Sequence, residues 1–286
     1  MILTPVSPLY AALLELARRG RLVFFAGLPG AGKSLLIHQL AHLAHARGRT
    51  IHLLQWDVVR PVFEASEPGR RYPQVDGVTH GVIRIAAGRW ARAEIRRWHE
   101  QHPDAGHLLI GETPFVGHRF IELARPASDA AEPILAVGST SFVIPVPSRE
   151  VRRYLEGQRE QRAQQPLHAR EKEDAQPQVL HALWRQLSGA ARELGLTDGS
   201  SEGGSDYDPQ VYQRLYLHLL RHRRTQVLLL DEILPTSGFS AYDFTVPYRD
   251  VLPDEDEVRR HIEAVEAAYP VHALLQREIE RWYVNP

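Results

Sequence analysis

Cysteine is absent from this chain of 286 residues, and lysine nearly so, because 32 of its 34 Lys and Arg residues are arginine. The lack of cysteine excludes disulfide bonds, cysteine-ligated zinc and thiol catalysis. No apolar run approaches the roughly 18 residues that a membrane-spanning helix needs. The first residues also lack a signal-peptide pattern. We therefore expect a soluble, cytoplasmic protein with no membrane partner.

An excess of charge of one sign is also missing. The formal net charge is −1 at pH 7, which argues against a dedicated nucleic-acid or anionic-membrane binder. The length is sufficient to bury a large core, so we expect one domain over residues 1–286. The sequence does not indicate an oligomeric state.

A glycine-rich segment is the most informative motif present. Residues 27–34 spell GLPGAGKS and match the phosphate-binding pattern G-x-x-x-x-G-K-[ST] in full. The glycines let the backbone curl, so that successive N–H groups point at phosphate oxygens. Lys33 would contact the β- and γ-phosphates of ATP, and the Ser34 hydroxyl would ligate Mg²⁺. The predicted nucleotide-binding residues are Gly27, Pro29, Gly30, Ala31, Gly32, Lys33, Ser34 and Leu35.

The surroundings of this motif support it. An unbroken apolar run at 22–26 precedes it, as expected for a buried parallel strand, and a helical segment follows over 35–47. Lys33 and Lys172 are the only lysines. In a chain that otherwise uses arginine, a compact ammonium at position 33 favours phosphate binding over a chance match.

Apolar runs that alternate with helical patterns predict an α/β fold. We expect a doubly wound, five-stranded parallel sheet flanked by helices, of the P-loop NTPase type. The expected strands are 22–26, 50–55, 108–110, 142–144 and 227–230. The expected helices include 81–102, 148–163, 177–194 and 209–222, whereas 61–77 is expected to be a loop. We also expect a lid insertion at 148–205, a flexible segment at 197–208 and a C-terminal helical extension at 252–286.

Two carboxylates follow strands at the edge of the sheet where ligands bind in such folds. Asp57, after the second strand, would orient or deprotonate an acceptor hydroxyl. Arg60, three residues later, would bind an anionic acceptor group. Glu112, after the third strand, would orient the water shell of Mg²⁺ or bind the acceptor. The alternative for each carboxylate is a capping role, with Arg60 as a solvated charge.

Arginines are concentrated between residues 149 and 170. Arg152 and Arg159 are seven residues apart and share a helix face, and Arg162 lies beside Arg159. We expect this segment to close over the phosphates, with Arg159 and Arg162 neutralising charge on the transferred group. The alternative is a solvated helix face, interleaved with glutamates. His38 and His42 have the spacing of a metal pair but lack an evident third ligand, so surface positions are expected.

With these residues in view, the chain resembles the small-molecule kinase branch of P-loop proteins, which holds the zeta-toxin, chloramphenicol-phosphotransferase and gluconate-kinase-like families. The resemblance covers about residues 20–235. Asp57 and Arg60 are similar to the acceptor-binding pair of that branch, and Arg159 and Arg162 to its arginine-bearing lid. Asp231 is similar in place to residues near the adenine site. The resemblance implies transfer of the γ-phosphate of ATP to a hydroxyl of a small acceptor.

Other functions fit parts of the chain. Residues 227–232 (VLLLDE) resemble the Walker B element of ABC- and AAA-type ATPases, where Asp231 would hold Mg²⁺ and Glu232 would polarise the attacking water. Residues 235–238 resemble its continuation, but displaced by two positions, and 187–190 are a poor match to the ABC signature loop. A GTPase is disfavoured because N-K-x-D is missing. A nucleotide sensor without phosphotransfer stays open.

Overall fold

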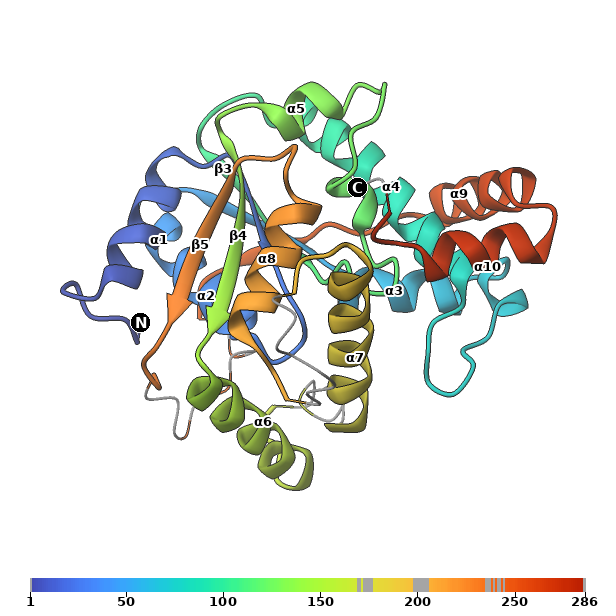
Figure 1. Ribbon diagram of the computed structural model, residues 1–286. Coiled ribbons are helices and arrows are strands. Elements are labelled where there is room, and N and C mark those ends of the chain that lie inside the picture. Colours follow the sequence, from blue (N-terminus) through green and yellow to red (C-terminus); the bar gives the residue numbers. More distant parts are fainter. Residues whose placement is uncertain are drawn as a thin grey trace.

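The structure is a computed structural model that describes residues 2–168, 171, 177–197, 206–234, 238, 240, 243 and 245–284. Its centre is one parallel sheet with the strand order β5-β4-β1-β3-β2-β6 (Figure 1). The strands are β1 (Leu22–Ala26), β2 (Thr50–Gln55), β3 (His107–Thr113), β4 (Thr140–Pro147), β5 (Thr225–Leu230) and β6 (Tyr248–Asp250). The α/β class and the parallel sheet are thus as predicted.

The number of strands is not as predicted. The sheet has six strands rather than five, because β6 pairs with the edge strand β2. The sequence of β6 is Tyr-Arg-Asp, which is too short and too polar to give an apolar run, so only its pairing with β2 defines it as a strand. The predicted β1 and β2 have the observed bounds, whereas β3 and β4 extend beyond their apolar cores, so that Glu112 belongs to β3 itself.

Helices cover both faces of the sheet. The helices are α1 (Pro8–Arg19), α2 (Lys33–His45), α3 (Trp56–Ala65), α4 (Gly81–Gln101), α5 (Glu132–Ala136), α6 (Arg149–Gln164), α7 (Pro177–Glu193), α8 (Pro209–Leu219), α9 (Glu255–Ala268) and α10 (His272–Glu280), with 3-10 turns η1 (Gly69–Arg71) and η2 (Ile121–Leu123). Successive residues of β1 face opposite ways: Val23 and Phe25 pack with α1 and α2, and Phe24 packs with α4, α7 and α8. Two hydrophobic cores therefore sandwich the sheet.

Helix α3 corrects the expectation of a loop from residue 61. The helix begins directly after β2 and continues through Pro61. Proline at this position has no N–H to donate to the carbonyl of Asp57, four residues earlier. The helix is nevertheless held by its buried face, which includes Trp56, Val59 and Phe63. Tertiary packing therefore outweighs the local preference against proline.

The segment predicted as a lid contains two helices that differ in packing. In Figure 1, α6 lies beyond the carboxyl end of β4, and only Val151 and Arg152 of this helix are buried. Helix α7 instead contributes Trp184 and Leu187 to the core that contains α8. Lys172, most of the predicted flexible segment (198–205) and 235–237 of the Walker B-like continuation lie outside the described residues.

The predicted C-terminal extension forms α9 and α10, which lie beside α4 (Figure 1). Asp254 and Glu257 form a capping box that starts α9. Glu257 also accepts from Trp90 Nε1 of α4 at 3.2 Å. This extension is therefore packed against the body of the domain.

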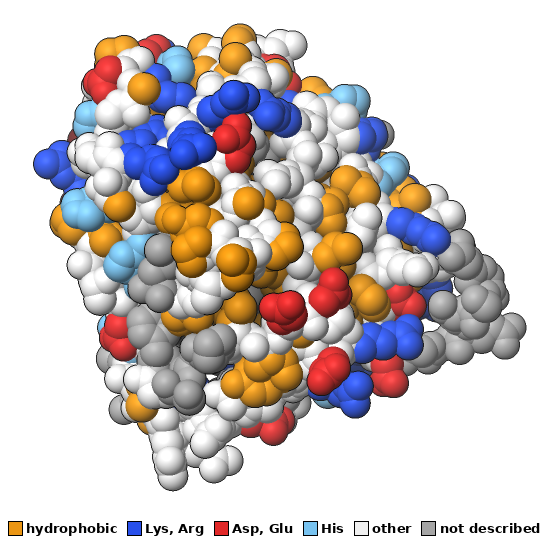
Figure 2. Space-filling view, turned by 90° about the vertical axis from the view of Figure 1, so that its left-hand side faces the viewer, with side chains coloured by type: hydrophobic (Ala, Val, Ile, Leu, Met, Phe, Trp, Pro, Cys, Tyr) orange, Lys and Arg blue, Asp and Glu red, His pale blue; other side chains and the backbone are white. Residues whose placement is uncertain are grey.

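The side of the molecule where α1 lies has hydrophobic side chains in its middle and basic side chains above them (Figure 2). Acidic side chains occur on the same face, in keeping with the near-neutral net charge. Within the described part of the chain, no helix is long and apolar enough to cross a membrane.

Candidate functional site

The glycine-rich loop follows β1 and leads into α2. Gly30 and Gly32 have φ angles of 75° and 80°, in the left-handed region that glycine adopts without strain. Among the described residues, no hydrogen bond uses the N–H groups of Gly30, Gly32, Lys33 or Ser34. Free N–H groups at the positive end of a helix form a cradle for an anion. The donors present therefore fit phosphate oxygens.

Neighbouring elements fix the shape of this loop. A Cβ atom on Gly27 would lie 2.3 Å from the hydroxyl oxygen of Tyr212 on α8, so close approach requires glycine there. On the other side of the loop, Leu230 at the end of β5 lies 3.1 Å from where a Cβ of Gly32 would be. The loop therefore packs between α8 and β5.

The loop lies at the point where the direction of the chain connections reverses. After β1 the chain passes through α2 to β2, on one side of β1, and after β4 it passes to β5, on the other side. Ligands of open parallel sheets bind in the crevice at such a reversal. Arg152 of α6 bridges this crevice, since its Nη1 donates to the carbonyl oxygen of Pro29 at 2.7 Å.

Arg152 is held firmly in this position. It is 2 % exposed, its Nε donates to Glu156 at 2.7 Å, and its guanidinium lies over the ring of Tyr207. A pocket of about 320 Å³ opens beside it between α6 and α7, lined also by Arg149, Arg153 and Trp184. Arg152 was expected on the same helix face as Arg159 but was not among the predicted site residues. Arg152 lies in the first turns after β4, and β4 is the neighbour of β1. This position is the sequence signal that could have indicated its contact with the glycine-rich loop.

Lys33 and Glu112 form an ion pair at the centre of the site. The ammonium nitrogen of Lys33 lies 3.1 Å from Glu112 Oε1 and donates to the carbonyl oxygen of Leu28 at 2.8 Å. The pair arises because β3 lies directly beside β1, with Glu112 in register with Phe25. Burial lowers the pKa of Lys33, and the charge of Glu112 opposes this effect. Glu112 is therefore brought to the loop, as expected.

Asp57 is brought to the same place from α3. Its side chain is exposed to solvent, yet desolvation raises its pKa, with a further contribution from Glu112. The charges of Arg60, Lys33 and Arg119 oppose this shift. A raised pKa makes this carboxylate a better proton acceptor. Arg60, on the same helix, is also ion-paired with Glu64 at 2.9 Å.

The segment after β3 is strained in a way that the sequence does not indicate. Phe115, His118 and Phe120 have φ angles of 61°, 65° and 63°. Left-handed conformations at bulky residues cost of order 1–3 kcal/mol each and concentrate at functional sites. Glu278 of α10 supports this segment from outside, since it lies 3.1 Å from His118 Nε2. The C-terminal extension thereby helps to hold the segment.

This strained segment brings two arginines together. The Nη1 atoms of Arg84 and Arg119 both lie 3.4 Å from where a Cβ of Gly117 would be. Arg84 donates to the carbonyl of Gly117 and Arg119 to that of Val116, and in the described part of the chain neither has a carboxylate within 4.0 Å. Burial and the charge of Arg119 lower the pKa of Arg84 to about 10. Burial lowers the pKa of Arg119 and the charge of Asp57 opposes this shift, so Asp57 lies within electrostatic reach of this arginine.

The other predicted residues lie as follows. Arg159 acts electrostatically on Lys33 and lowers its pKa, so it belongs to the same neighbourhood. Arg162 is ion-paired with Glu171 at 2.9 Å. Asp231 and Glu232 are exposed at the end of β5, which β4 separates from β1. Glu112 and Asp57 are the carboxylates among the largest contributions to the pKa shift of Lys33.

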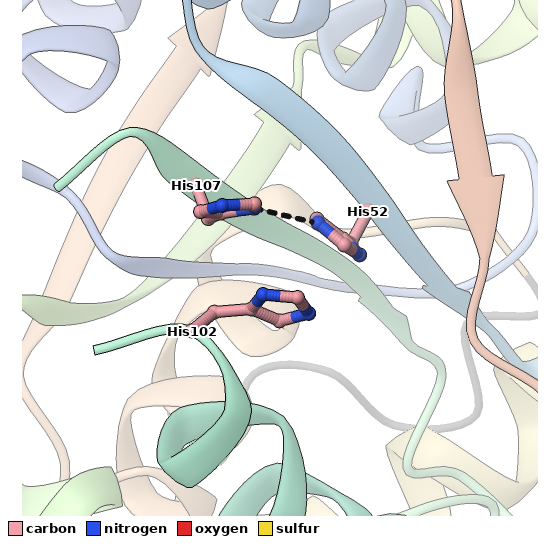
Figure 3. Close-up of side chains that lie close together, drawn as sticks. All are labelled: His52, His102 and His107. Atoms are coloured by element: carbon pink, nitrogen blue, oxygen red, sulfur yellow. Dashed lines mark hydrogen bonds between the residues drawn. The ribbon is translucent and has the colours of Figure 1, made fainter. Parts of the chain in front are cut away.

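Histidines gather at the opposite edge of the sheet. His52 of β2, His107 of β3 and His102 after α4 have ring nitrogens within 4.8 Å of one another (Figure 3). Burial and the two neighbouring imidazoles lower the pKa of His52 to about 4. His38 and His42 of α2 also have adjacent rings, but His38 is buried rather than at the surface as predicted.

Comparisons with known proteins found no match among protein-family models, curated proteins or solved structures. The function is therefore inferred from the chemistry of the site.

Proposed function

We propose that this protein is a kinase with a P-loop NTPase fold, which transfers the γ-phosphate of ATP to a hydroxyl of a small acceptor that also has an anionic group. The observation that supports it most is the position of Asp57, a solvent-accessible carboxylate in the electrostatic reach of Lys33. Motor-type hydrolysis needs only a carboxylate that acts on water, whereas transfer needs a recess for a second substrate.

The residues fit the binding of ATP and Mg²⁺. The free N–H groups of Gly30, Gly32 and Ser34 would hold phosphate oxygens. Lys33 would exchange part of its contact with Glu112 for the β- and γ-phosphates. Mg²⁺ would supply charge neutralisation, with the half-buried Ser34 hydroxyl as a ligand and Glu112 orienting its water shell. Asp57 would orient the acceptor hydroxyl and take its proton, and Arg152 and Arg159 would offset negative charge.

The nature of the acceptor follows from the arginines. Two guanidinium groups that share the surroundings of Gly117 without a carboxylate repel each other. An acceptor carboxylate or phosphate would relieve that repulsion through charge-assisted hydrogen bonds. Arg119 is the best placed, because its charge also reaches Asp57.

The test is acceptor-dependent consumption of ATP. We expect turnover with hydroxy acids or phosphorylated polyols, and much less with the matching neutral polyols. Asp57→Asn should lower kcat by about 10²–10⁴-fold while ATP binding is retained, and the exposed Asp256→Asn serves as the matched control. Steady hydrolysis without any acceptor would instead support the ATPase alternative with Asp231 and Glu232.

The preference of the enzyme for an acceptor with an anionic group is measured separately. Arg119→Met should raise KM for a charged acceptor by about 10–100-fold, as expected for the loss of a charge-assisted contact, and leave KM for ATP unchanged. Equal KM effects on charged and neutral acceptors would refute the anionic group but not the kinase. Binding of ATP without turnover on any acceptor would refute the kinase and leave the nucleotide sensor.

A further inference from the structure

A cluster of three imidazoles lies far from the glycine-rich loop, at the amino end of the sheet. His107 is the first residue of β3, and His52 is the third residue of β2. The register pairs His107 with Thr50 and His52 with Leu109, so the two histidines are diagonal neighbours on one face. That face is covered by α4, whose Trp98 lies against His52 with ring centroids 5.5 Å apart.

The third imidazole, that of His102, lies at the end of α4. His102 follows Trp98 by four residues, so both side chains lie on the face of the helix that meets the sheet. Arg21 fixes this turn, since its guanidinium donates to the carbonyl oxygens of His102 and Pro103. Three separate elements therefore position the cluster, which is not a chance contact within one flexible loop.

We propose that His52, His102 and His107 form a site for one divalent transition-metal ion, with Zn²⁺ as the natural occupant. His52 Nε2 and His107 Nδ1 are 3.1 Å apart. Two nitrogens bound to a tetrahedral zinc at its usual bond lengths lie roughly 3.3 Å apart. In Figure 3 these two rings point at each other, with His102 directly below them. All three ligand nitrogens lie within 4.8 Å of one another, and the ring of His102, which is stacked on that of His107 with centroids 4.3 Å apart, would turn toward the ion on binding.

The surroundings fit such a site. Asp104 Oδ2 lies 4.0 Å from His107 Nε2, the nitrogen that would not bind the metal. The other oxygen of Asp104 accepts from the N–H of Gly106 at 2.6 Å, which fixes the carboxylate. A carboxylate behind a metal-bound histidine orients the ring and increases its basicity. Three histidines leave the fourth position for water, and histidine nitrogen prefers Zn²⁺, Cu²⁺ or Ni²⁺ over Mg²⁺ or Ca²⁺.

Binding there would hold together β2, which leads to Asp57, and β3, which contains Glu112. His52 lies five residues before Asp57, and His107 lies five residues before Glu112. The metal would join β2, β3 and α4 at the opposite edge of the sheet from Lys33. Because the site is separate from Lys33, binding can be detected without any kinase activity.

The test is Zn²⁺ titration of the untagged protein by calorimetry, with Co²⁺ absorption as a second probe. We expect one Zn²⁺ per chain and an intense visible Co²⁺ spectrum of tetrahedral type, with only nitrogen and oxygen ligands because the chain has no cysteine. A hundredfold excess of Zn²⁺ over its Kd should raise Tm by on the order of 5 °C. His102→Gln and His107→Gln should each weaken binding by about 100-fold or more.

His42→Gln is the matched control, because it removes a histidine from the other adjacent pair and should leave Zn²⁺ binding unchanged. X-ray absorption of the zinc-loaded wild-type protein gives the ligand set without any substitution, and three imidazoles are expected. A spectrum without three imidazoles, or unchanged affinity in folded His102→Gln and His107→Gln, would overturn the proposal. Loss of binding in His42→Gln would move the site to α2 and refute it equally.

Discussion

Replacing Gly27 by alanine tests how closely the glycine-rich loop is packed. Gly27 does not have a positive φ angle, so an alanine is permitted by its own backbone. The obstacle is external, because the new Cβ would lie 2.3 Å from the Tyr212 hydroxyl oxygen and 3.5 Å from the Cβ of Ala31. The first contact is more than an ångström too short, whereas the second is an ordinary van der Waals contact.

The expected loss of folding free energy in Gly27→Ala follows from these distances. Forcing an extra methyl group into a packed site costs about 1–3 kcal/mol of folding free energy. Tyr212 is fully buried among the helices that face the sheet, so its ring cannot swing into solvent. The substitution Tyr212→Phe removes the clashing oxygen, and the next ring atom is 3.6 Å away. The double variant Gly27→Ala/Tyr212→Phe should therefore recover most of the lost folding free energy. The coupling energy between the two substitutions should be about 1–2 kcal/mol.

Urea unfolding of the wild type, both single variants and the double variant measures this coupling. Thermal shifts with ATP on the same four proteins report whether the loop keeps its shape. Additive losses in Gly27→Ala/Tyr212→Phe would refute the close approach of Tyr212 to the loop. A stable Gly27→Ala variant with wild-type ATP binding would do the same.

Two further predictions concern the supports of the site. Arg152→Met should weaken ATP binding by about 10–100-fold, because the loop loses the charge-assisted hydrogen bond at Pro29; calorimetry checks this against the exposed Arg153→Met, and equal affinities would contradict it. A hydrogen bond from His118 lowers the pKa of Glu278 from 4.5 to about 2, and so does Arg125, whose Nη1 forms an ion pair with Glu278 Oε1 at 2.5 Å. This stabilisation is present above the unfolded pKa and is lost as the pH falls through the folded pKa. Glu278→Gln should therefore cost about 2–3 kcal/mol at pH 7, and the gap from wild type should close as the pH falls from about 4.5 to about 2. Urea unfolding against the exposed control Glu280→Gln measures that gap, and a gap that persists at the lowest pH would exclude the ion-pair origin.

Much of the fold could be predicted because its signals are local. A strand that is buried on both faces is mostly apolar, so the bounds of β1 follow from the unbroken run LVFFA, and those of β2 from the apolar residues of TIHLLQ. β6 had no such signal, since Tyr248–Asp250 becomes a strand only by pairing with β2. The prediction of a loop from residue 61 was wrong for a related reason. Pro61 disfavours a helix locally, but burial of Phe63 holds α3.

The residues of the site also fall into two groups: those that the sequence indicates and those that only tertiary packing brings together. Asp57 and Glu112 could be found because each follows or ends a strand, and parallel strands bring their carboxyl ends to one edge. Arg84 and Arg119 could not be found, because their meeting depends on left-handed residues at 115–120 that no sequence rule indicates. Arg162 was assigned to the lid from helical spacing and from the resemblance to an arginine-bearing lid, and its ion pair with Glu171 could not be predicted from either.

The sequence by itself determined the glycine-rich turn and the start of α2, because both are properties of a few consecutive residues. It also determined the class of sheet, through runs of apolar residues that only a doubly covered strand can accommodate. Only the tertiary structure decided which charges meet. The Lys33–Glu112 pair and the contact of Arg152 with Pro29 each join residues more than 45 positions apart, and so does the approach of His52 to His102 and His107. Electrostatic interactions between such residues depend on distance and burial, which exist only once the strands have their order.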